Sequence, residues 1–352
     1  MNLKSIVFYA EKGRIMKRSG AAFPVLLALG WGANQAFLRA DETPAATASN
    51  APASLAAPVR LSSPPDAGRG WRTNSLGMVF APAPNPQVLF SIWETRVQDF
   101  AVFAAAVNFT APDPIAVRSD VRSSERDWRH PGFPQNPAHP VVFVSWEDAR
   151  RFCEWLTQKE QAAGRLETHQ RYRLPTDAEW SQAAGAGKYP WSEMLPPRAI
   201  SVSNAAATRS GADDDRRFFP PPAGAGNYAG TEFRALDTSF RSLKGYTDGY
   251  LQTSPAGHFT ANRHGLCDLG GNVWEWCEDW YHKEMLTKEL ESKLPFYNED
   301  GGGKTFRVLR GASWLDSNPA ILRSDCRFFE FPDMRNDNIG FRVVLDCGSL
   351  QK

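Results

Sequence analysis

One segment of this sequence, residues 265–280, combines side chains that could bind a cation. It places three tryptophans within seven residues and carries four acidic side chains around a Gly-Gly-Asn turn. These residues are Trp274, Trp276, Trp280, Asp268, Glu275, Glu278 and Asp279. Carboxylates set among backbone carbonyls are the hard oxygen ligands that calcium takes. A buried tryptophan cluster with a solvated acidic edge has the same composition, so this segment alone leaves both interpretations open.

Three further patterns resemble known motifs, but each lacks a required feature. Residues 301–305 match the end of a phosphate-binding loop, yet Asn298 stands where that loop needs a glycine. Ser313 lacks the second glycine of a nucleophile elbow. The six histidines follow no zinc-ligand spacing. His258 and His264 lie near the acidic segment and could face a cleft, although loop histidines are the favoured interpretation.

The composition favours a loop-rich globular protein. The chain has 352 residues, 42% of them hydrophobic, which is enough for one large domain or two ordinary ones. Its 27 glycines, 26 prolines, 12 tryptophans and 22 phenylalanines indicate loops held together by aromatic packing. The formal net charge of +1 gives no electrostatic reason to expect binding to nucleic acid or to an anionic membrane.

The N-terminal region predicts export. Lys17 and Arg18 precede a short apolar run at residues 21–30, and small residues follow, as in a secretory signal peptide. We therefore assign residues 1–40 to a signal peptide or N-terminal leader, with the first methionine and Met16 both open as translation starts. A periplasmic or cell-envelope location follows. The run is short for a membrane span, so a stable anchor is expected only if the segment is left uncleaved.

Local patterns beyond the leader predict an α+β domain. Residues 41–69 are rich in Ala and Pro and are expected to form a flexible linker, so the folded domain should span residues 70–348. Capping boxes predict three helices, which begin at Thr95, Ser145 and Thr176. Apolar runs predict short strands at residues 88–93, 141–144, 307–310 and 341–345. Residues 185–264 show almost no periodicity, and such irregular stretches are commonly functional or stabilised by an ion.

The five cysteines form no Cys-x-x-Cys pair, which argues against a zinc ribbon or a thioredoxin-type redox motif. An odd number leaves at least one thiol unpaired within the chain. If the protein is exported, Cys277 and Cys326 are the preferred disulfide, because each lies beside a motif expected in the same core. Cys153 with Cys347 is the second choice. The spacing of cysteines in one sequence does not determine their connectivity.

Five motifs occur in a fixed order across the predicted domain. They are His139–Trp146, Arg173–Trp180, Gly271–Trp276, Arg310–Trp314 and Asn338–Arg342, and Trp93–Arg96 with Phe100 opens the series. With these motifs, the chain resembles the formylglycine-generating enzyme family, also called sulfatase-modifying factors, over about residues 77–346. The resemblance implies a single α+β domain of the C-type-lectin-like kind, with little regular secondary structure, short strands and three main helices.

The resemblance also implies two calcium sites. The first would use two side chains and two backbone carbonyls, at Asn227, Tyr228, Asp248 and Tyr250. The second would lie around the Gly-Asn-x-Trp-Glu motif, at Asp268, Gly271, Val273 and Glu275. Both sets consist of the oxygen ligands that calcium prefers.

The chain departs from the family at the positions that carry the chemistry. Active members bind copper(I) through two cysteines five residues apart, just after the motif that here ends at Trp314. Those positions are occupied by Asp316 and Ile321. Copper(I) requires soft thiolate ligands, so copper binding and formylglycine formation by the family mechanism are not expected. Cys326, five residues further on, would be a single thiolate and would not rebuild the site. Whether the chain is an enzyme is therefore open.

The sequence predicts an exported, calcium-stabilised domain of this family that acts as a binding or accessory module for an unknown protein or small-molecule ligand. The loops at residues 185–264 and 314–337 would form its cleft. The expected contact residues are Asp316, Asn318, Arg323, Arg327, Asp333, Arg335 and Asn336. A solvated polar surface would account for the same residues. The competing hypothesis is a divergent oxidoreductase on the same scaffold that acts on a protein cysteine or another sulfur substrate.

Overall fold

The computed structural model describes five ranges of the chain, and all of them fall in one compact unit. The ranges are residues 70–110, 126–193, 219–235, 241–294 and 305–348. The predicted leader and the predicted linker lie outside the described residues. Within these ranges, no helix is both long enough and apolar enough to cross a membrane.

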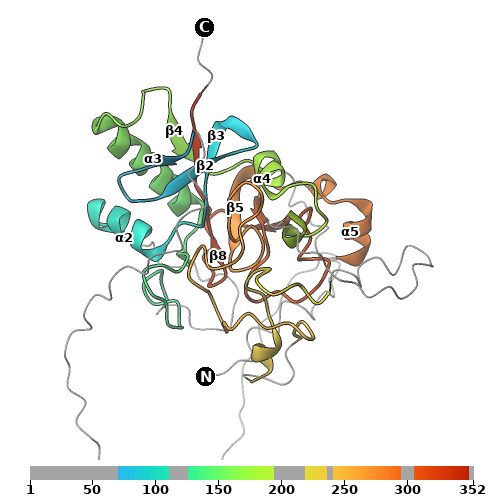
Figure 1. Ribbon diagram of the computed structural model, residues 1–352. Helices are drawn as coiled ribbons and strands as arrows, with labels where there is room; N and C mark the ends of the chain where they lie inside the picture. The colour runs from blue at the N-terminus through green and yellow to red at the C-terminus, as the bar shows by residue number, and fades with distance from the viewer. Residues whose placement is uncertain (1–69, 111–125, 194–218, 236–240, 295–304, 349–352) are drawn as a thin grey trace, which may run out of the picture. The chain divides into compact units, whose positions relative to one another are not determined.

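Figure 1 shows where the main helices lie. Side-chain caps determine where two of them begin. The predicted boxes at Ser145 and Thr176 are confirmed: in each, the hydroxyl accepts a backbone N–H, and an acidic side chain three residues later accepts the N–H of the cap residue. These boxes open α3 (Trp146–Ala162) and α4 (Asp177–Ala184). A further short helix, α5 (Lys288–Lys293), was not predicted.

The first helix begins one residue later than predicted. The cap of α2 (Val97–Ala106) is Arg96, whose backbone N–H and guanidinium both donate to Asp99. Thr95 cannot serve as the cap, because its backbone donates to Phe341 and accepts from Val141 in contacts between distant loops.

The strands form two small antiparallel or mixed sheets. The first has five strands in the order β1-β2-β3-β9-β4 and the second has four in the order β7-β6-β5-β8. The strands of the first sheet are β1 (Arg72–Thr73), β2 (Val79–Ala83), β3 (Asn85–Ser91), β4 (Arg171–Arg173) and β9 (Val344–Asp346). Those of the second are β5 (Trp274–Trp280), β6 (Arg307–Arg310), β7 (Phe328–Glu330) and β8 (Ile339–Gly340). The acidic tryptophan segment thus supplies the strand β5, which pairs with β6 and β8.

Two strand predictions are corrected by the structure. Residues 141–144 do not form a strand, because Phe143 has φ 56° and breaks the extended conformation. The run at 341–345 is not one strand either. The chain leaves the second sheet after β8, at Gly340, and enters the first sheet at β9, so residues 341–343 connect the two sheets and only residues 344–345 of the run lie in a strand.

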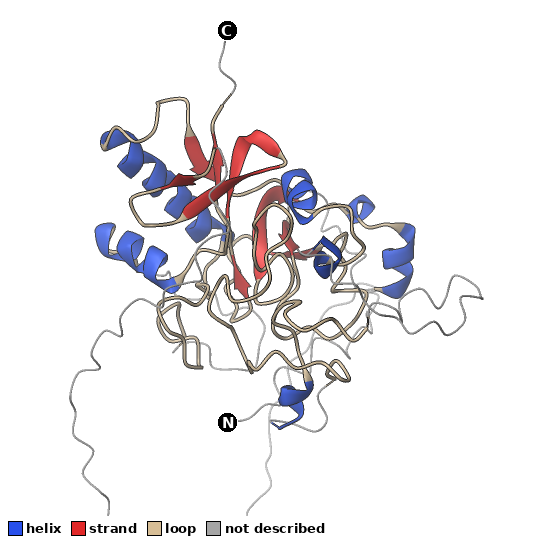
Figure 2. Cartoon of the chain, viewed as in Figure 1, coloured by secondary structure: helices blue, strands red, loops and turns tan. Residues whose placement is uncertain are grey.

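Aromatic side chains hold the loops against the sheets, as the composition predicts. Trp146 donates its indole N–H to the carbonyl of Cys277, and Trp276 donates to the carbonyl of Val144, both at 3.0 Å. In the described part of residues 185–264 the regular structure is limited to two short turns, η2 (Pro190–Glu193) and η4 (Thr231–Ala235). Loops fill much of the lower part of the view in Figure 2. The fold is therefore α+β with little regular secondary structure.

All five cysteines are free thiols in the structure. The two that are preferred for a disulfide, Cys277 and Cys326, are both buried but pack in different hydrophobic clusters. The structure therefore gives that pairing no support.

A buried histidine predicts how stability depends on pH. His139 is 8% exposed, its Nδ1 lies 2.9 Å from the Thr253 hydroxyl, and burial lowers its pKa to about 4. Between about pH 6.5 and 4 the unfolded chain therefore binds a proton that the folded protein does not, so stability should fall by on the order of 2 kcal/mol as the pH drops through this window. Urea unfolding at pH 7 and pH 5 measures the loss. His139→Gln should remove it, whereas the exposed His130→Gln should not, and equal pH dependence in both variants would contradict this assignment.

Candidate metal centre

Three carboxylates and one guanidinium meet inside the domain, at the start of β5. Glu94 follows β3, Asp268 lies in the loop before β5, Glu275 is on β5, and Arg342 lies between β8 and β9. All four side chains are buried, with exposed fractions of 0% for Glu94, Glu275 and Arg342 and 5% for Asp268. Three negative groups against one positive group leave the cluster two positive charges short of neutrality. A cluster of this kind needs protons or a further cation.

Arg342 is fully committed to Glu275 and to backbone carbonyls. Its Nη2 lies 2.7 Å from one Glu275 oxygen, and its Nε lies 3.1 Å from both. The remaining donors reach the carbonyls of Ser91 and Cys267. Trp180 of α4 donates its indole N–H to the second Glu275 oxygen at 2.9 Å. Glu275 is therefore tied to a structural ion pair, and only spare lone pairs of its oxygens are left for a metal.

The other two carboxylates each keep a buried oxygen without a partner. One Glu94 oxygen accepts the Asn272 amide at 2.7 Å, and one Asp268 oxygen accepts the Gly257 N–H. The second oxygen of each is buried and makes no hydrogen bond within the described residues. Burial raises the pKa of Glu94 well above its usual range and that of Asp268 to about 6, and neighbouring carboxylates add to both effects. These orphaned oxygens are donors of the type that a hard cation takes.

The first predicted set of ligands, at Asn227, Tyr228, Asp248 and Tyr250, lies in two loops that meet beside Tyr228. Asp248 accepts the N–H groups of Tyr228 and Tyr250 at 2.8 and 2.9 Å, one on each oxygen. The Asn227 side chain is buried, and its carbonyl oxygen has no partner within the described residues. The Glu232 carboxylate interacts with that of Asp248, and burial together with this neighbour raises the pKa of Asp248 to about 8. Carboxylate and amide oxygens are the kind of ligand that a hard cation takes. Among the described residues, however, no three or more His, Cys, Asp or Glu side chains are grouped so that they alone could hold a metal ion.

The two ligand sets are joined by close backbone packing. Gly271, between them, has φ 82°, and an added Cβ would overlap the carbonyl group of Asn227. The Asn272 N–H donates to that same carbonyl at 2.8 Å. The loop around Asn227 and the loop before β5 therefore cannot shift independently.

Gly271→Ala is expected to cost at least about 2 kcal/mol of unfolding free energy, because it combines a strained φ with a clash against backbone. Gly77→Ala is the matched control, since Gly77 has φ 75° and no atom within 4 Å of an added Cβ. The control should show only the left-handed strain, about 1 kcal/mol. Urea unfolding of both variants measures the difference, and equal costs would mean that the contact with Asn227 is not tight.

The two positions that correspond to the copper ligands hold groups of another kind. Asp316 accepts the backbone N–H and the hydroxyl of Ser313 at 2.9 and 2.7 Å, and burial raises its pKa to about 6. Ile321 packs against the main hydrophobic cluster. Burial raises the pKa of the Cys326 thiol to about 12, so this sulfur is protonated at neutral pH. Neither position supplies the thiolate that copper(I) needs.

The predicted cleft residues separate into two groups. The arginines are engaged by carboxylates of three different helices: Arg323 pairs with Glu289 of α5, Arg327 with Asp177 of α4, and Arg335 with Asp148 of α3. Their geometry is that of structural ion pairs, which bind the 314–337 loop to the body of the domain. Exposed side chains are found at Asn318, Asp333 and Asn336.

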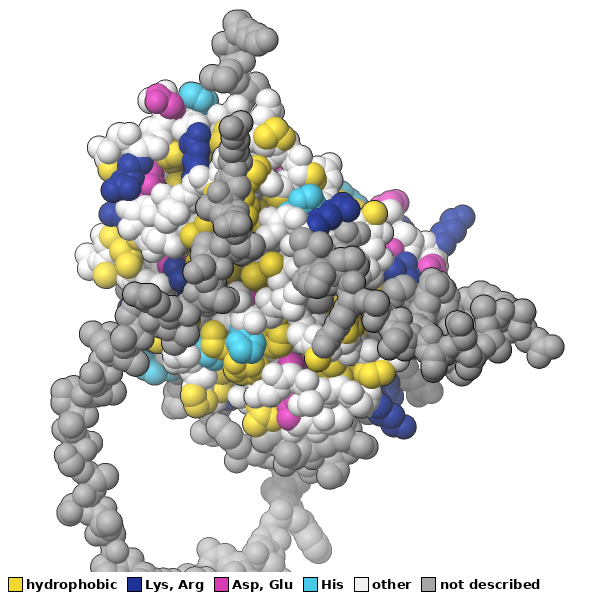
Figure 3. All heavy atoms as spheres, viewed as in Figure 1, with side chains coloured by type: hydrophobic (Ala, Val, Ile, Leu, Met, Phe, Trp, Pro, Cys, Tyr) yellow, Lys and Arg dark blue, Asp and Glu magenta, His cyan; other side chains and the backbone are white. Residues whose placement is uncertain are grey.

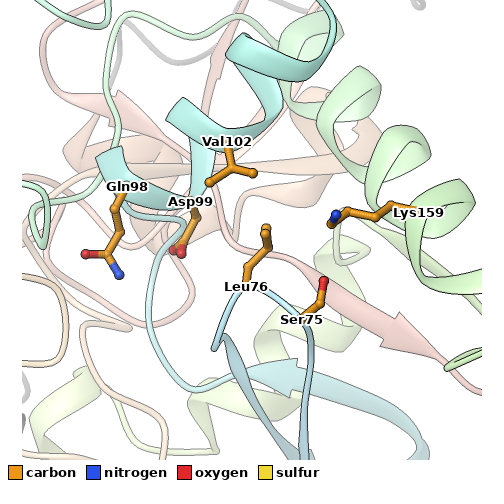
Figure 4. A pocket seen from close by; sticks show the side chains of 6 residues that line it. All are labelled: Ser75, Leu76, Gln98, Asp99, Val102 and Lys159. Atoms are coloured by element: carbon orange, nitrogen blue, oxygen red, sulfur yellow. The ribbon is translucent and has the colours of Figure 1, made fainter. Parts of the chain in front are cut away.

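A surface hollow of about 370 Å³ lies away from these loops. Ser75 and Leu76 of the turn between β1 and β2, Val102 of α2 and Lys159 of α3 line it (Figure 4). On the face shown in Figure 3, the visible acidic and basic side chains are scattered among uncharged ones.

Two residues of the cluster were not assigned a role from the sequence. Glu94 and Arg342 both fall inside recognised motifs, Trp93–Arg96 and Asn338–Arg342. The available signal was an acidic residue directly after the apolar Ile92 and Trp93 in the one motif, and a basic residue beside the apolar Phe341 in the other. Their separation by 248 positions hides the contact from any local pattern.

Comparisons with known proteins agree with the family resemblance. Residues 88–347 match the sulfatase-modifying factor enzyme 1-like domain. A formylglycine-generating enzyme of Streptomyces coelicolor is 32% identical over 231 residues, which are 62% of this chain and 58% of that protein. An inactive C-alpha-formylglycine-generating enzyme 2 of Mus musculus is 30% identical over 235 residues, 63% of this chain and 55% of that protein. The chain thus spans less than two thirds of the length of these relatives. The structure of PvdO from Pseudomonas aeruginosa aligns at 22% identity with a TM-score of 0.44, over 80% of this chain and 88% of that one.

Proposed function

This chain belongs to the family of sulfatase-modifying factor enzyme 1-like domains, and on that premise we propose that it is an exported, calcium-stabilised binding or accessory module without the copper-oxidase centre. Active members, by the resemblance, have a pair of thiolates at two positions. In this chain those positions are occupied by Asp316 and Ile321. The observation that carries the proposal is the hydrogen bonding of Asp316 to Ser313, which commits this carboxylate to the turn after β6.

Calcium supports the fold in this proposal, and it takes no part in a reaction. Asp268, Glu275, the added Glu94 and the carbonyls of Gly271 and Val273 would hold one ion. Asn227, Asp248 and the carbonyls of Tyr228 and Tyr250 would hold the other. The unpartnered oxygens of Glu94, Asp268 and Asn227 support this assignment, because a bound cation would satisfy buried acceptors that otherwise cost free energy. Each ion would neutralise a local excess of carboxylates and fix loops that have little secondary structure.

The surface offered to a partner lies on the two loops that flank β7, between β6 and β8. The exposed side chains of Asn318, Asp333 and Asn336 are available there, while the arginine pairs hold the loop in place. These exposed groups are polar hydrogen-bonding groups, which suits a protein or a polar small molecule. The N-terminal leader pattern supports export of the module to the periplasm or cell envelope.

The alternative, a divergent oxidoreductase, rests on the polar cluster around Asp316. Ser313 lies between Asp316 and Asn338, and the side-chain amide oxygen of Asn338 is buried without a partner within the described residues. A carboxyl group whose pKa is raised to about 6 is suited to proton transfer near neutral pH.

One assay separates the two proposals. The purified chain is incubated in air with copper, and separately with iron, and a cysteine-containing sulfatase peptide, and formylglycine is measured by mass spectrometry. The Streptomyces coelicolor relative serves as the positive control. A binding module gives no formylglycine above the enzyme-free reaction. Repeated turnover would overturn the proposal in favour of the oxidoreductase.

A further inference from the structure

Asn272 occupies a position that touches both candidate cation sites. It is fully buried, with φ 62°, in the Gly-Gly-Asn turn before β5. Its amide nitrogen donates to Glu94 at 2.7 Å, and its amide oxygen accepts the side-chain amide of Asn227 at 3.1 Å. One planar group thus contacts a candidate ligand of each site, Glu94 on one side and Asn227 on the other.

The amide of Asn272 cannot turn over without losing these contacts. Its oxygen also accepts the Ser254 N–H at 2.9 Å, and its nitrogen also approaches the Ser254 carbonyl at 3.4 Å. A turned amide would place its nitrogen against the N–H groups of Ser254 and Asn227, and its oxygen against the Glu94 carboxylate. Because both mismatches would be buried, each would be costly. The observed orientation is therefore fixed.

This orientation determines which oxygen each neighbour can offer to a cation. The amide nitrogen of Asn227 donates to the Asn272 amide oxygen and to the Gln252 carbonyl, which leaves the Asn227 amide oxygen unpartnered within the described residues. One Glu94 oxygen accepts a hydrogen bond from the Asn272 amide, and the other is unpartnered within the described residues. The Asn272 side chain thus leaves one oxygen of Asn227 available at one site and one oxygen of Glu94 available at the other.

We propose that the Asn272 side chain couples the two sites, so that calcium binds to them cooperatively. This inference rests on the calcium assignment of the proposed function. An ion at Glu94 and Asp268 holds Glu94 in the orientation that receives the Asn272 amide, and this in turn holds Asn227 with its oxygen toward the other site. Binding of the first ion therefore orders both loops. The second ion then binds more tightly, because less conformational entropy is lost when it binds.

Repulsion between the two ions opposes this effect only weakly. When the carboxyl groups that face a bound ion are ionised, Glu94, Asp268 and Glu275 carry two more negative charges than Arg342 offsets, and Asp248 with Glu232 carries two at the other site. Each doubly charged ion is therefore neutralised by its own carboxylates. The hydrogen-bonded connection then decides the sign of the coupling, which should be positive and on the order of 5- to 150-fold in affinity.

Calcium titration of the chelator-stripped full chain by calorimetry tests the proposal. The wild type should take up two ions with a Hill coefficient above one. Asp248→Asn, which weakens the site of Asn227, should also weaken binding at the other site by the coupling factor, because coupling is reciprocal. In an Asn272→Gly background, which tolerates the positive φ, Asp248→Asn should leave the other site unchanged. Asn318→Gly is the matched control on an exposed loop.

If Asn272→Gly does not fold, Asn227→Asp tests the same contact, since it removes the amide donor but keeps an oxygen ligand. Two ions should then bind without cooperativity. Two independent ions in the wild type, or full cooperativity in Asn227→Asp, would overturn the coupling while leaving calcium stabilisation intact. No calcium binding at all would overturn the calcium assignment and the coupling with it.

Discussion

Arg342→Met is expected to lower the unfolding free energy by about 3–5 kcal/mol, the cost of leaving a buried charge without its partner. Arg342 is the one cation among Glu94, Asp268 and Glu275 in the described part of the chain, and it makes bonds of 2.7–3.1 Å to Glu275. Without it, three buried carboxylates face one another. The loss is measured by urea unfolding in the presence of a chelator.

Calcium should restore part of that loss, because an ion at Glu94 and Asp268 would supply the missing positive charge. The stability of Arg342→Met should therefore depend more strongly on calcium than that of the wild type. Arg171→Met is the control: its ion pair with Asp346 spans 3.7 Å and its side chain is 66% exposed, so at most about 1 kcal/mol is expected. A cost for Arg342→Met no larger than for Arg171→Met would show that the cluster is not under electrostatic stress.

Removal of calcium is expected to have the second large effect. An ion that binds only the folded state at 100 times its Kd stabilises by about 2.7 kcal/mol per site. Two sites should therefore raise Tm by roughly 10 °C or more for a domain of this size. Asp268→Asn should remove about half of the calcium-dependent shift, because the unpartnered oxygen of Asp268 is one of the proposed ligands.

Differential scanning calorimetry with excess calcium and with chelator measures this shift. Asp333→Asn, on an exposed loop, is the matched control and should respond to calcium as the wild type does. A Tm indifferent to calcium and chelator in every variant would contradict the metal assignment.

The features predicted well from the sequence are those set by neighbouring residues. The caps of α3 and α4 each need only a hydroxyl and an acid three residues apart, so Ser145 and Thr176 are recognisable without tertiary information. The same reasoning fails by one residue at α2, because tertiary contacts of Thr95 take its backbone and Arg96 becomes the cap.

Predictions that depend on distant partners failed or were incomplete. The run at residues 341–345 has the composition of one strand, but residues 341–343 connect the two sheets and only the end of the run joins β9. Arg323, Arg327 and Arg335 were predicted to line a cleft, but in the structure they form ion pairs. Their partners, Glu289, Asp177 and Asp148, cannot be identified from nearby sequence. Asn272 shows the same limit, since its contacts with Asn227 and Glu94 span 45 and 178 residues.

The metal content of the native protein tests the account most directly. The chain is purified from its natural host without chelators and examined by elemental analysis. We expect about two calcium ions per chain and no stoichiometric transition metal, because the donors at both sites are hard oxygens and the copper positions hold Asp316 and Ile321. Stoichiometric copper or iron, or an absence of calcium, would contradict the account.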